Sequence, residues 1–148
     1  MILQEDDAFV ASKTEAALDG GIGVIFCCGD SVEQREESMT IEVATTQLKA
    51  VQEKIAGRSK IVIAYKSTWA IDTGKVATTE QAQEVQAAIR AWLKGVSERV
   101  ADETRIIYGG SVNEKNRKPL SNRADIDGFL VGGTSPKLAF TDIINSRL

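Results

Sequence analysis

Short apolar runs alternate along this chain with longer segments in which apolar residues recur at helical spacing. The apolar runs predict strands over residues 21–28, 60–66, 104–108 and 127–131. The helical spacing predicts helices over residues 7–19, 40–56, 78 or 79 to about 94, and about 137 to 146, with a short helix between the last two strands. Strand and helix in series, four times over, are typical of a parallel sheet with right-handed crossovers. The pattern therefore predicts an α/β fold.

Individual residues support these boundaries. Thr78 and Gln81 have the spacing of a capping box, which fits a helix that begins at residue 78 or 79. Gly57 follows the apolar stripe of the segment 40–56 and marks the end of that helix. Residues 61–65, Ile-Val-Ile-Ala-Tyr, are apolar at every position, as expected of a parallel strand that is buried on both faces.

Composition places the chain among globular proteins and narrows its partners. Hydrophobic residues make up 43% and charged residues 26%, and 148 residues are the length of one ordinary domain. The net charge of −3 and the scattered Lys and Arg residues give no nucleic-acid footprint. Apolar runs are of strand length and the first residues are acidic, so neither a membrane span nor secretion is predicted, and a cytoplasmic location is expected.

Two adjacent cysteines, Cys27 and Cys28, make a disulfide framework implausible and fit a reduced, cytosolic setting. In a strand they point to opposite faces. We interpret both as small buried hydrophobic residues, with a redox or ligand role as the alternative. The sequence contains no histidine, and the acidic residues of segment 33–37 lack metal-ligand spacing. No metal or other cofactor is predicted.

Five motifs follow one another along the chain. They are residues 24–30, Val-Ile-Phe-Cys-Cys-Gly-Asp; 65–75, Tyr-Lys-Ser-Thr-Trp-Ala-Ile-Asp-Thr-Gly-Lys; 108–112, Tyr-Gly-Gly-Ser-Val; 127–133, Asp-Gly-Phe-Leu-Val-Gly-Gly; and 142–145, Asp-Ile-Ile-Asn. In this order they resemble the triosephosphate isomerase family from about its fourth helix onward. The resemblance implies that residues 1–148 form a single domain, a parallel (βα)4 half of a TIM-type (βα)8 barrel, whose complete form needs about 250 residues.

The resemblance also implies that the family's chemistry is incomplete here. Lys66 stands at the position of the family's catalytic glutamate, and Ser67 and Thr68 replace its Pro-Val. The family's catalytic histidine and first-loop lysine have no counterpart in these residues. A carboxylate that removes a proton from carbon cannot be replaced by an ammonium of opposite charge. We therefore expect a truncated homologue that is inactive as an isomerase.

Part of the family's phosphate site is retained. By resemblance, Ser111, Gly132 and Gly133 are the anion-binding residues, since backbone N–H groups of their loops and the start of a short helix hold phosphate in the family. Glycine allows close approach of the chain to an anion, and backbone conformations closed to other residues. On spacing alone, the same glycines are also explained as tight turns between strand and helix.

The segment 69–75 resembles the family's mobile lid, and Trp69, Thr73 and Gly74 keep its composition. Asp72 replaces a lid glycine whose N–H group reaches the phosphate in the family. A carboxylate about 4 Å from an anion costs about 4 kcal/mol at an effective dielectric constant of about 20. The alternative is that Asp72 points to water in a loop that no longer closes.

Lys66 has the widest range of interpretations. It ends its strand, where barrel enzymes keep their reacting groups, and class I aldolases resemble this arrangement in carrying a lysine on the corresponding strand. A lysine with a depressed pKa can form a Schiff base with a carbonyl substrate. An ion pair with Asp30 or Asp72 would instead raise the pKa of Lys66 and leave it inert. The alternative function is thus a repurposed isomerase or lyase that uses Lys66 as nucleophile or proton donor on a small carbonyl compound, and whether the chain is an enzyme stays open.

Half a barrel would leave two strand edges unpaired and its inward-facing side chains uncovered. We expect two copies to associate and so complete or cover the half barrel. Rearranged helices and a complementary N-terminal half are the alternatives. The predicted ligand is a small anionic or carbonyl compound, and neither nucleic acid nor membrane is an expected partner.

Overall fold

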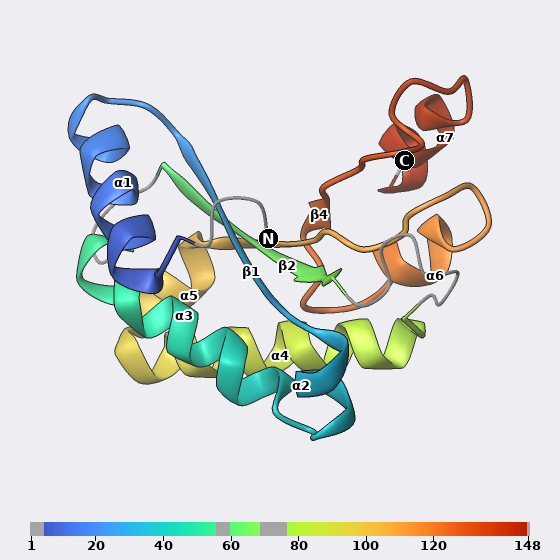
Figure 1. Ribbon diagram of the computed structural model, residues 1–148. Helices are drawn as coiled ribbons and strands as arrows, with labels where there is room; N and C mark the ends of the chain where they lie inside the picture. The colour runs from blue at the N-terminus through green and yellow to red at the C-terminus, as the bar shows by residue number, and fades with distance from the viewer. Residues whose placement is uncertain (1–4, 56–59, 69–76, 148) are drawn as a thin grey trace.

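The computed structural model describes residues 5–55, 60–68 and 77–147 and shows helices packed against a small sheet (Figure 1). Four strands form that sheet: β1 (Val24–Asp30), β2 (Ile61–Ser67), β3 (Arg105–Tyr108) and β4 (Gly128–Phe129). The helices are α1 (Asp7–Asp19), α2 (Val32–Glu36), α3 (Thr40–Ile55), α4 (Thr79–Val96), α5 (Glu98–Glu103), α6 (Arg117–Ser121) and α7 (Phe140–Ile144), followed by a 3₁₀ turn, η2 (Asn145–Arg147). None of the helices in the described ranges has the length and apolar character to cross a bilayer.

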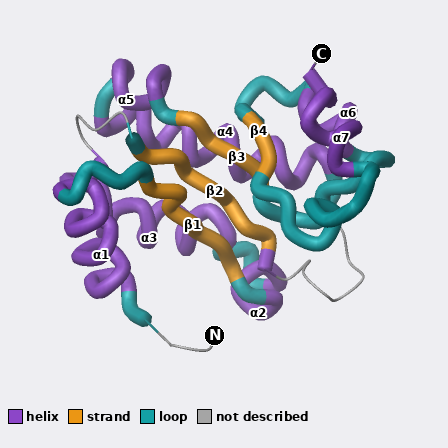
Figure 2. Tube along the Cα trace, turned by 90° about the horizontal axis from the view of Figure 1, so that it is seen from above, coloured by secondary structure: helices purple, strands orange, loops and turns teal. Residues whose placement is uncertain are grey.

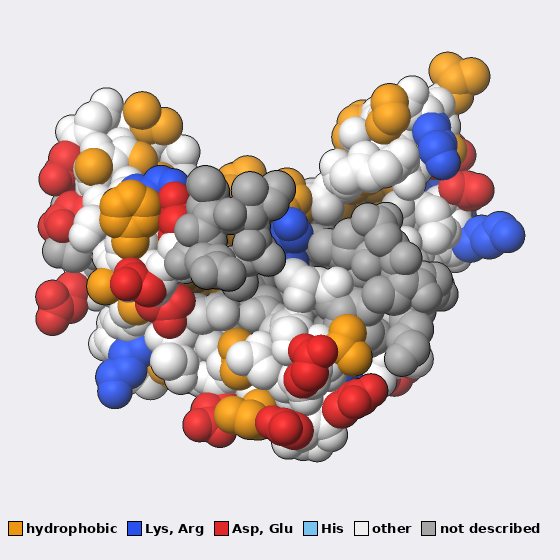
Figure 3. Space-filling view, in the orientation of Figure 1, with side chains coloured by type: hydrophobic (Ala, Val, Ile, Leu, Met, Phe, Trp, Pro, Cys, Tyr) orange, Lys and Arg blue, Asp and Glu red, His pale blue; other side chains and the backbone are white. Residues whose placement is uncertain are grey.

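The strands run parallel in the order β1-β2-β3-β4, so each strand pairs with its neighbour in sequence (Figure 2). This confirms the predicted α/β fold with a parallel four-stranded sheet. Helices α3 and α4 lie side by side beneath the sheet, and α6 and α7 lie at the end that carries β4 (Figure 1). The space-filling view in the same orientation is hollowed at the top, between the side that carries α1 and the side that carries α7 (Figure 3). The register places Gly29 of β1 opposite Lys66 of β2, and Tyr65 of β2 opposite Tyr108 of β3. All four carboxyl ends therefore meet along one edge of the sheet.

The two faces of the sheet differ in burial because side chains alternate along a strand. In β1, Phe26 and Cys28 face the helices and are buried, whereas Ile25 and Cys27 lie on the other face and are exposed. The helix-side core also holds the larger buried side chains, among them Tyr65, Tyr108, Leu48, Ile63, Ile89 and Leu93. The interpretation of both cysteines as buried is thus correct for Cys28 and wrong for Cys27, which lies on the face opposite α3 and α4.

Two helices were not predicted, and several boundaries differ. Helix α2 is short and polar, yet Ser31 and Gln34 form a complete capping box at its start. Ser97 likewise caps α5. Strand β1 begins later than the predicted residue 21, because the turn after α1 extends through Ile22, whose N–H group bonds the carbonyl of Ala17 at 2.9 Å. The predicted capping box of α4 between Thr78 and Gln81 is confirmed.

The C-terminal third departs most from the predicted boundaries. Residues 127–131 were predicted as a strand, and β4 covers only Gly128–Phe129. A helix was predicted over about 137–146, but residues 133–139 form turns and a bend, and α7 begins only at Phe140.

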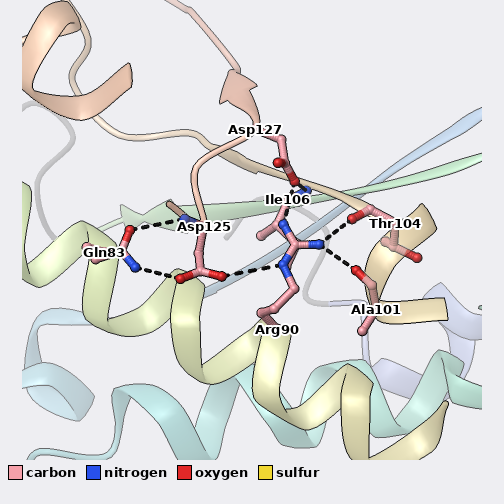
Figure 4. Close-up of polar contacts among 7 residues, drawn as sticks. All are labelled: Gln83, Arg90, Ala101, Thr104, Ile106, Asp125 and Asp127. Atoms are coloured by element: carbon pink, nitrogen blue, oxygen red, sulfur yellow. Dashed lines mark hydrogen bonds and ion pairs between the residues drawn. The ribbon is translucent and has the colours of Figure 1, made fainter. Parts of the chain in front are cut away.

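A polar cluster around Arg90 ties α4 and α5 to β3 and β4 (Figure 4). Its guanidinium donates to the carbonyls of Ala101 and Thr104 at 2.6 and 2.8 Å and to Oδ2 of Asp127 at 2.6 Å. The same Asp127 oxygen accepts the N–H group of Ile106 at 2.7 Å. Because the arginine side chain is only 14% exposed, these charge-assisted bonds are more stabilising than surface ion pairs.

Gln86 on α4 is fully buried, and its amide nitrogen and oxygen have no hydrogen-bond partner within the described part of the chain. A buried polar group without a partner carries its desolvation cost uncompensated. We predict that Gln86→Met raises the free energy of unfolding by about 1–3 kcal/mol, because the thioether has similar length and no orphan amide. The measurement is the urea midpoint at unchanged m-value.

Gln83, one turn earlier on the same helix, provides the matched control. Its amide exchanges two hydrogen bonds with Asp125, at 2.6 and 3.3 Å. Gln83→Met should therefore lower stability while Gln86→Met raises it. Equal destabilisation by the two changes would contradict the argument from the unpaired amide.

Candidate functional site

A cavity of about 530 Å³ opens at the carboxyl ends of β2, β3 and β4. One lysine from β2 and the two loops that follow β3 and β4 line it: Lys66, Gly109, Gly110, Ser111, Val112, Leu130, Val131, Gly132, Gly133 and Thr134. Functional residues of α/β proteins gather at this edge of a parallel sheet. Segments predicted as separate motifs along the sequence therefore meet in one place.

Lys66 is the second-to-last residue of β2, and its side chain lines the cavity. It lies opposite Gly29 in the register, on the sheet face away from α3 and α4. Asp30 points to the opposite face, where its buried carboxylate accepts the hydroxyls of Tyr65 at 2.9 Å and Thr40 at 2.5 Å. The predicted ion pair between Lys66 and Asp30 is therefore wrong, because the two side chains point to opposite faces of the sheet.

The loop after β3 is held close to β2. The N–H group of Gly109 donates to the carbonyl of Tyr65 at 2.8 Å, which extends the ladder past the end of β3. A side chain at Gly110 would collide with the hydroxyls of Tyr108 and Ser67, which lie 3.2 Å apart. Burial raises the pKa of the Tyr108 phenol, and its hydrogen bond with Ser67 lowers it in part. The phenol thus stays neutral, and it packs against the loop at Gly110.

The loop after β4 carries the predicted glycine pair, Gly132 and Gly133. Both are exposed, an added Cβ would meet nothing within 4 Å, and positive φ angles in the described ranges occur only at Gly21 and Ser38. The prediction that these glycines supply conformations closed to other residues is therefore wrong. Their remaining advantage is that an anion can approach the backbone closely. The expected helix start beside them is replaced by a turn in which Ser135 N–H bonds Gly132 C=O at 2.8 Å.

Several backbone N–H groups in these two loops donate to no acceptor within the ranges that the structure describes. They belong to Gly110, Ser111 and Val112 after β3, and to Gly132, Gly133 and Thr134 after β4. Ser111, Gly132 and Gly133 are exposed, so their N–H groups are open to solvent or to a ligand. Val112 is buried and Gly110 and Thr134 are partly buried, and because such N–H groups are nearly always paired, an acceptor can bind there. Successive free N–H groups of this kind form anion-binding concavities.

The charge of the cavity wall points the same way. Among the residues that the structure describes, its lining contains one ionisable side chain, Lys66, and no aspartate or glutamate, and no described carboxylate forms an ion pair with that ammonium. Thr134 donates to the carbonyl of Val112 at 3.0 Å and so fixes the two loops to each other. Chemically, the arrangement suits a small anion near the loops, in a cavity that the positively charged Lys66 also lines.

The predicted site residues fall into two groups. The structure brings Lys66, Ser111, Gly132 and Gly133 together around the cavity. The predicted lid residues Trp69, Asp72, Thr73 and Gly74 lie outside the described residues. Gly110 and Thr134 also line the cavity but were not predicted as site residues. The available signals were the glycine pair Gly109-Gly110 and the position of Thr134 directly after Gly133.

Comparison with known proteins gives consistent matches over the chain. The family model described as triosephosphate isomerase matches residues 1–147. Curated proteins named triosephosphate isomerase from Emericella nidulans, Aspergillus oryzae and Neurospora crassa are 59%, 58% and 58% identical to it. The matches cover 100%, 100% and 99% of this chain, but 61%, 60% and 59% of those proteins. The chain thus spans about three fifths of the length of these relatives.

Proposed function

Because this chain belongs to the triosephosphate isomerase family, we propose that its 148 residues keep a phosphate-type anion site without the family's isomerase activity. The observation that carries the proposal is the cluster of N–H groups from two loops that have no acceptor among the described residues, around a cavity where Lys66 is the one ionisable residue in the described lining. Such a cluster supplies positive potential to a phosphate monoester without any further side chain. The proposed ligand class is a small phosphate ester.

Isomerisation of a triose phosphate needs a base that removes a proton from carbon and an acid or dipole that stabilises the enediolate. The resemblance puts an ammonium, Lys66, at the position of the base, and these residues contain no histidine. The geometry adds that Asp30, at the end of β1 next to the cavity strand β2, is turned toward the helices. No group described at the cavity replaces the missing base.

We predict no measurable interconversion of the two triose phosphates by this purified chain in a coupled assay. Lys66→Glu should not restore it, because the remaining groups of the family's site are still missing, so turnover should stay at least about 10⁴-fold below that of a complete isomerase assayed alongside. Robust turnover by the unaltered chain would show that the assignment of the chemistry is wrong.

A second candidate function rests on the place of Lys66 in the cavity lining, which also includes apolar Leu130 and Val131. A lysine in such surroundings can condense with a carbonyl compound, and this makes a repurposed isomerase or lyase the alternative. Borohydride treatment with a panel of aldehydes and keto acids, followed by mass spectrometry, tests it. A reduced adduct on Lys66 supports the alternative. If Lys66→Ala leaves every cellular and in vitro phenotype of the chain unchanged, the hypothesis that Lys66 is a nucleophile is rejected.

We also propose that two copies of the chain associate as a single-domain half barrel. β1 and β4 are the edges of the four-stranded sheet, and Ile25 is 52% exposed on the face away from α3 and α4. Exposed strand edges and apolar sheet faces favour pairing with another chain. Light scattering over a concentration series is the test; a strictly monomeric, cooperatively folded protein would contradict the proposal.

A further inference from the structure

We propose that two copies of the chain pair head to tail, so that the α1 end of each copy packs against the α7 end of the other. The inference rests on the association of two copies proposed above and adds which surfaces meet. The α1 end is defined as residues 5–22, and the α7 end as residues 114–123 and 132–146, which include α6 and α7. The two ends stand on either side of the hollow in Figure 3.

Large apolar side chains are exposed around this hollow. Within the described parts of the chain six large hydrophobic side chains are exposed, and four of them lie at the two ends: Phe9 and Ile22 at the α1 end, Leu138 and Ile144 at the α7 end. A fifth, Ile25, lies on the sheet face that is open between the ends. Single exposed apolar residues are ordinary, whereas a group of them marks an interaction site.

The two ends carry opposite charge, and this decides how the copies are oriented. The α1 end has five acidic residues and one basic residue, and Figure 3 shows acidic side chains gathered over that side. The α7 end has two acidic residues and five basic ones, which are Lys115, Arg117, Lys118, Arg123 and Lys137. The net charges are therefore −4 and +3. Because like charges placed together disfavour a wrong arrangement, α1 ends avoid each other and each meets an α7 end.

Arg117, the first residue of α6, is the residue at the α7 end that most lacks a partner. It is partly buried, its Nε atom is buried without a hydrogen-bond partner, and no carboxylate in the described ranges forms an ion pair with its guanidinium. A partly buried charge without an acceptor carries its desolvation cost uncompensated. Arginine is also enriched among the residues that dominate protein interfaces. A carboxylate from the α1 end of the second copy supplies the missing acceptor.

Head-to-tail pairing can close on itself. Each copy has one end of each kind, so a twofold axis gives two identical contacts in a closed dimer, whereas a rotation that does not close gives an open chain of copies. The closed dimer is the form proposed here, because it leaves neither end exposed. It also turns the hollow of each copy toward the other, so that Ile25 and Cys27 on the open sheet face are covered.

Cross-linking tests which ends meet. Three variants each place one thiol at an exposed hydroxyl position of a helix: Ser12→Cys in α1, Thr141→Cys in α7, and Thr46→Cys in α3 as the control at neither end. All carry Cys27→Ser, which removes the exposed native thiol, while buried Cys28 stays in place. With a short bismaleimide, an equal mixture of the Ser12→Cys and Thr141→Cys chains should give a covalent dimer. Neither chain alone, and no mixture with Thr46→Cys, should do so.

Charge reversal tests what orients the copies. Lys118→Glu with Lys137→Glu, at the α7 end, should raise the dissociation constant of the dimer about tenfold or more in sedimentation equilibrium. Lys49→Glu with Lys94→Glu makes the same change of net charge at exposed positions of α3 and α4. This control should stay within about twofold at physiological salt, where charges far from the contact are screened.

Reversing the other end as well should rescue the dimer. Asp7→Lys with Asp19→Lys, added to the α7-end variant, exchanges the signs of the two ends and restores their attraction. A chain that carries both Ser12→Cys and Thr141→Cys reports closure, since its cross-linking should stop at the dimer. A ladder of longer products would overturn the closed form.

The remaining outcomes separate the two proposals. A folded chain that stays monomeric at every concentration would overturn the association and the pairing together. A dimer that is cross-linked through Ser12→Cys alone or Thr141→Cys alone would leave the association intact and overturn head-to-tail pairing. The same follows if Thr46→Cys cross-links with equal yield, or if reversal at the α7 end leaves the dissociation constant unchanged.

Discussion

Gly29→Ala should lower the free energy of unfolding by about 3 kcal/mol or more, enough to leave little folded protein at 37 °C. A Cβ at this position would lie well inside van der Waals contact with the carbonyl oxygen of Lys66 and 3.2 Å from its carbonyl carbon. Both atoms belong to the paired backbone of β2, opposite Gly29 in the ladder, so no flexible side chain can move aside. The two strands would have to separate.

Separation of β1 from β2 is further opposed by Gln47 of α3, whose side-chain amide forms two hydrogen bonds with the backbone of Gly29. Its oxygen accepts the Gly29 N–H group at 2.9 Å and its nitrogen donates to the Gly29 carbonyl at 3.1 Å. A shift of β1 away from β2 would break these bonds as well. The loss is measured as the change in urea midpoint, and by yield of soluble protein if no folding transition remains.

Gly23→Ala is the matched control for this change. It lies just before β1, where an added Cβ would approach the Lys60 carbonyl oxygen at an ordinary 3.6 Å. Its effect should stay within about 0.5 kcal/mol, as at most surface positions. Similar losses from Gly23→Ala and Gly29→Ala would mean that the close approach of β1 and β2 is not the cause.

Asp127→Ala is expected to destabilise the fold by about 3 kcal/mol and to weaken phosphate binding at the same time. The change leaves the Arg90 guanidinium, 14% exposed, with Asp125 as its remaining acid at 3.5 Å, and it leaves the Ile106 N–H group without an acceptor. Removing one partner of a largely buried charge pair costs far more than the pair contributes over an apolar substitute. Because Asp127 directly precedes β4, the loop that ends at Thr134 loses its anchor.

Glu103→Ala provides the comparison, since it breaks the exposed ion pair between Arg99 and Glu103 on α5. Pairs of this kind contribute about 0.3–0.5 kcal/mol. Two readouts are needed, thermal or urea unfolding and titration with a phosphate ester. An Asp127→Ala chain with unaltered stability would refute the role given to the Arg90 cluster, whereas unaltered phosphate binding would refute only its link to the loop.

The parallel sheet was predictable because its strands are apolar along most of their length. The apolar run Ile-Val-Ile-Ala-Tyr at 61–65 is typical of a parallel strand that is buried on both faces, and β2 is found at Ile61–Ser67. The order of the strands followed from serial connections. Helix α2 escaped prediction because its five residues are mostly polar, although Ser31 and Gln34 carried the capping signal.

The site was predictable only as far as neighbouring strands fix it. Lys66, Ser111 and the glycine pair end up together because each follows or ends a parallel strand, and strand ends share one edge. What a linear pattern cannot convey is the face to which a side chain points once the register is set. That is why Asp30, close to Lys66 in the expected site, turns out to bond Tyr65 and Thr40 on the far side of the sheet.

The adjacent cysteines lie on opposite faces of β1, so the chain carries two natural sites for thiol labelling, one for each face of the sheet. Burial, together with the neighbouring Cys27, raises the pKa of the Cys28 thiol to about 12, so at neutral pH its reactive thiolate forms only when the strand leaves the core. The rate at which Cys28 is alkylated therefore measures how often β1 leaves the core. Cys27 is exposed, and the rate of its alkylation reports how freely reagents reach the other face of the sheet. If copies of the chain cover that face, the Cys27 rate falls with protein concentration, and no added dye or tag is required to see it.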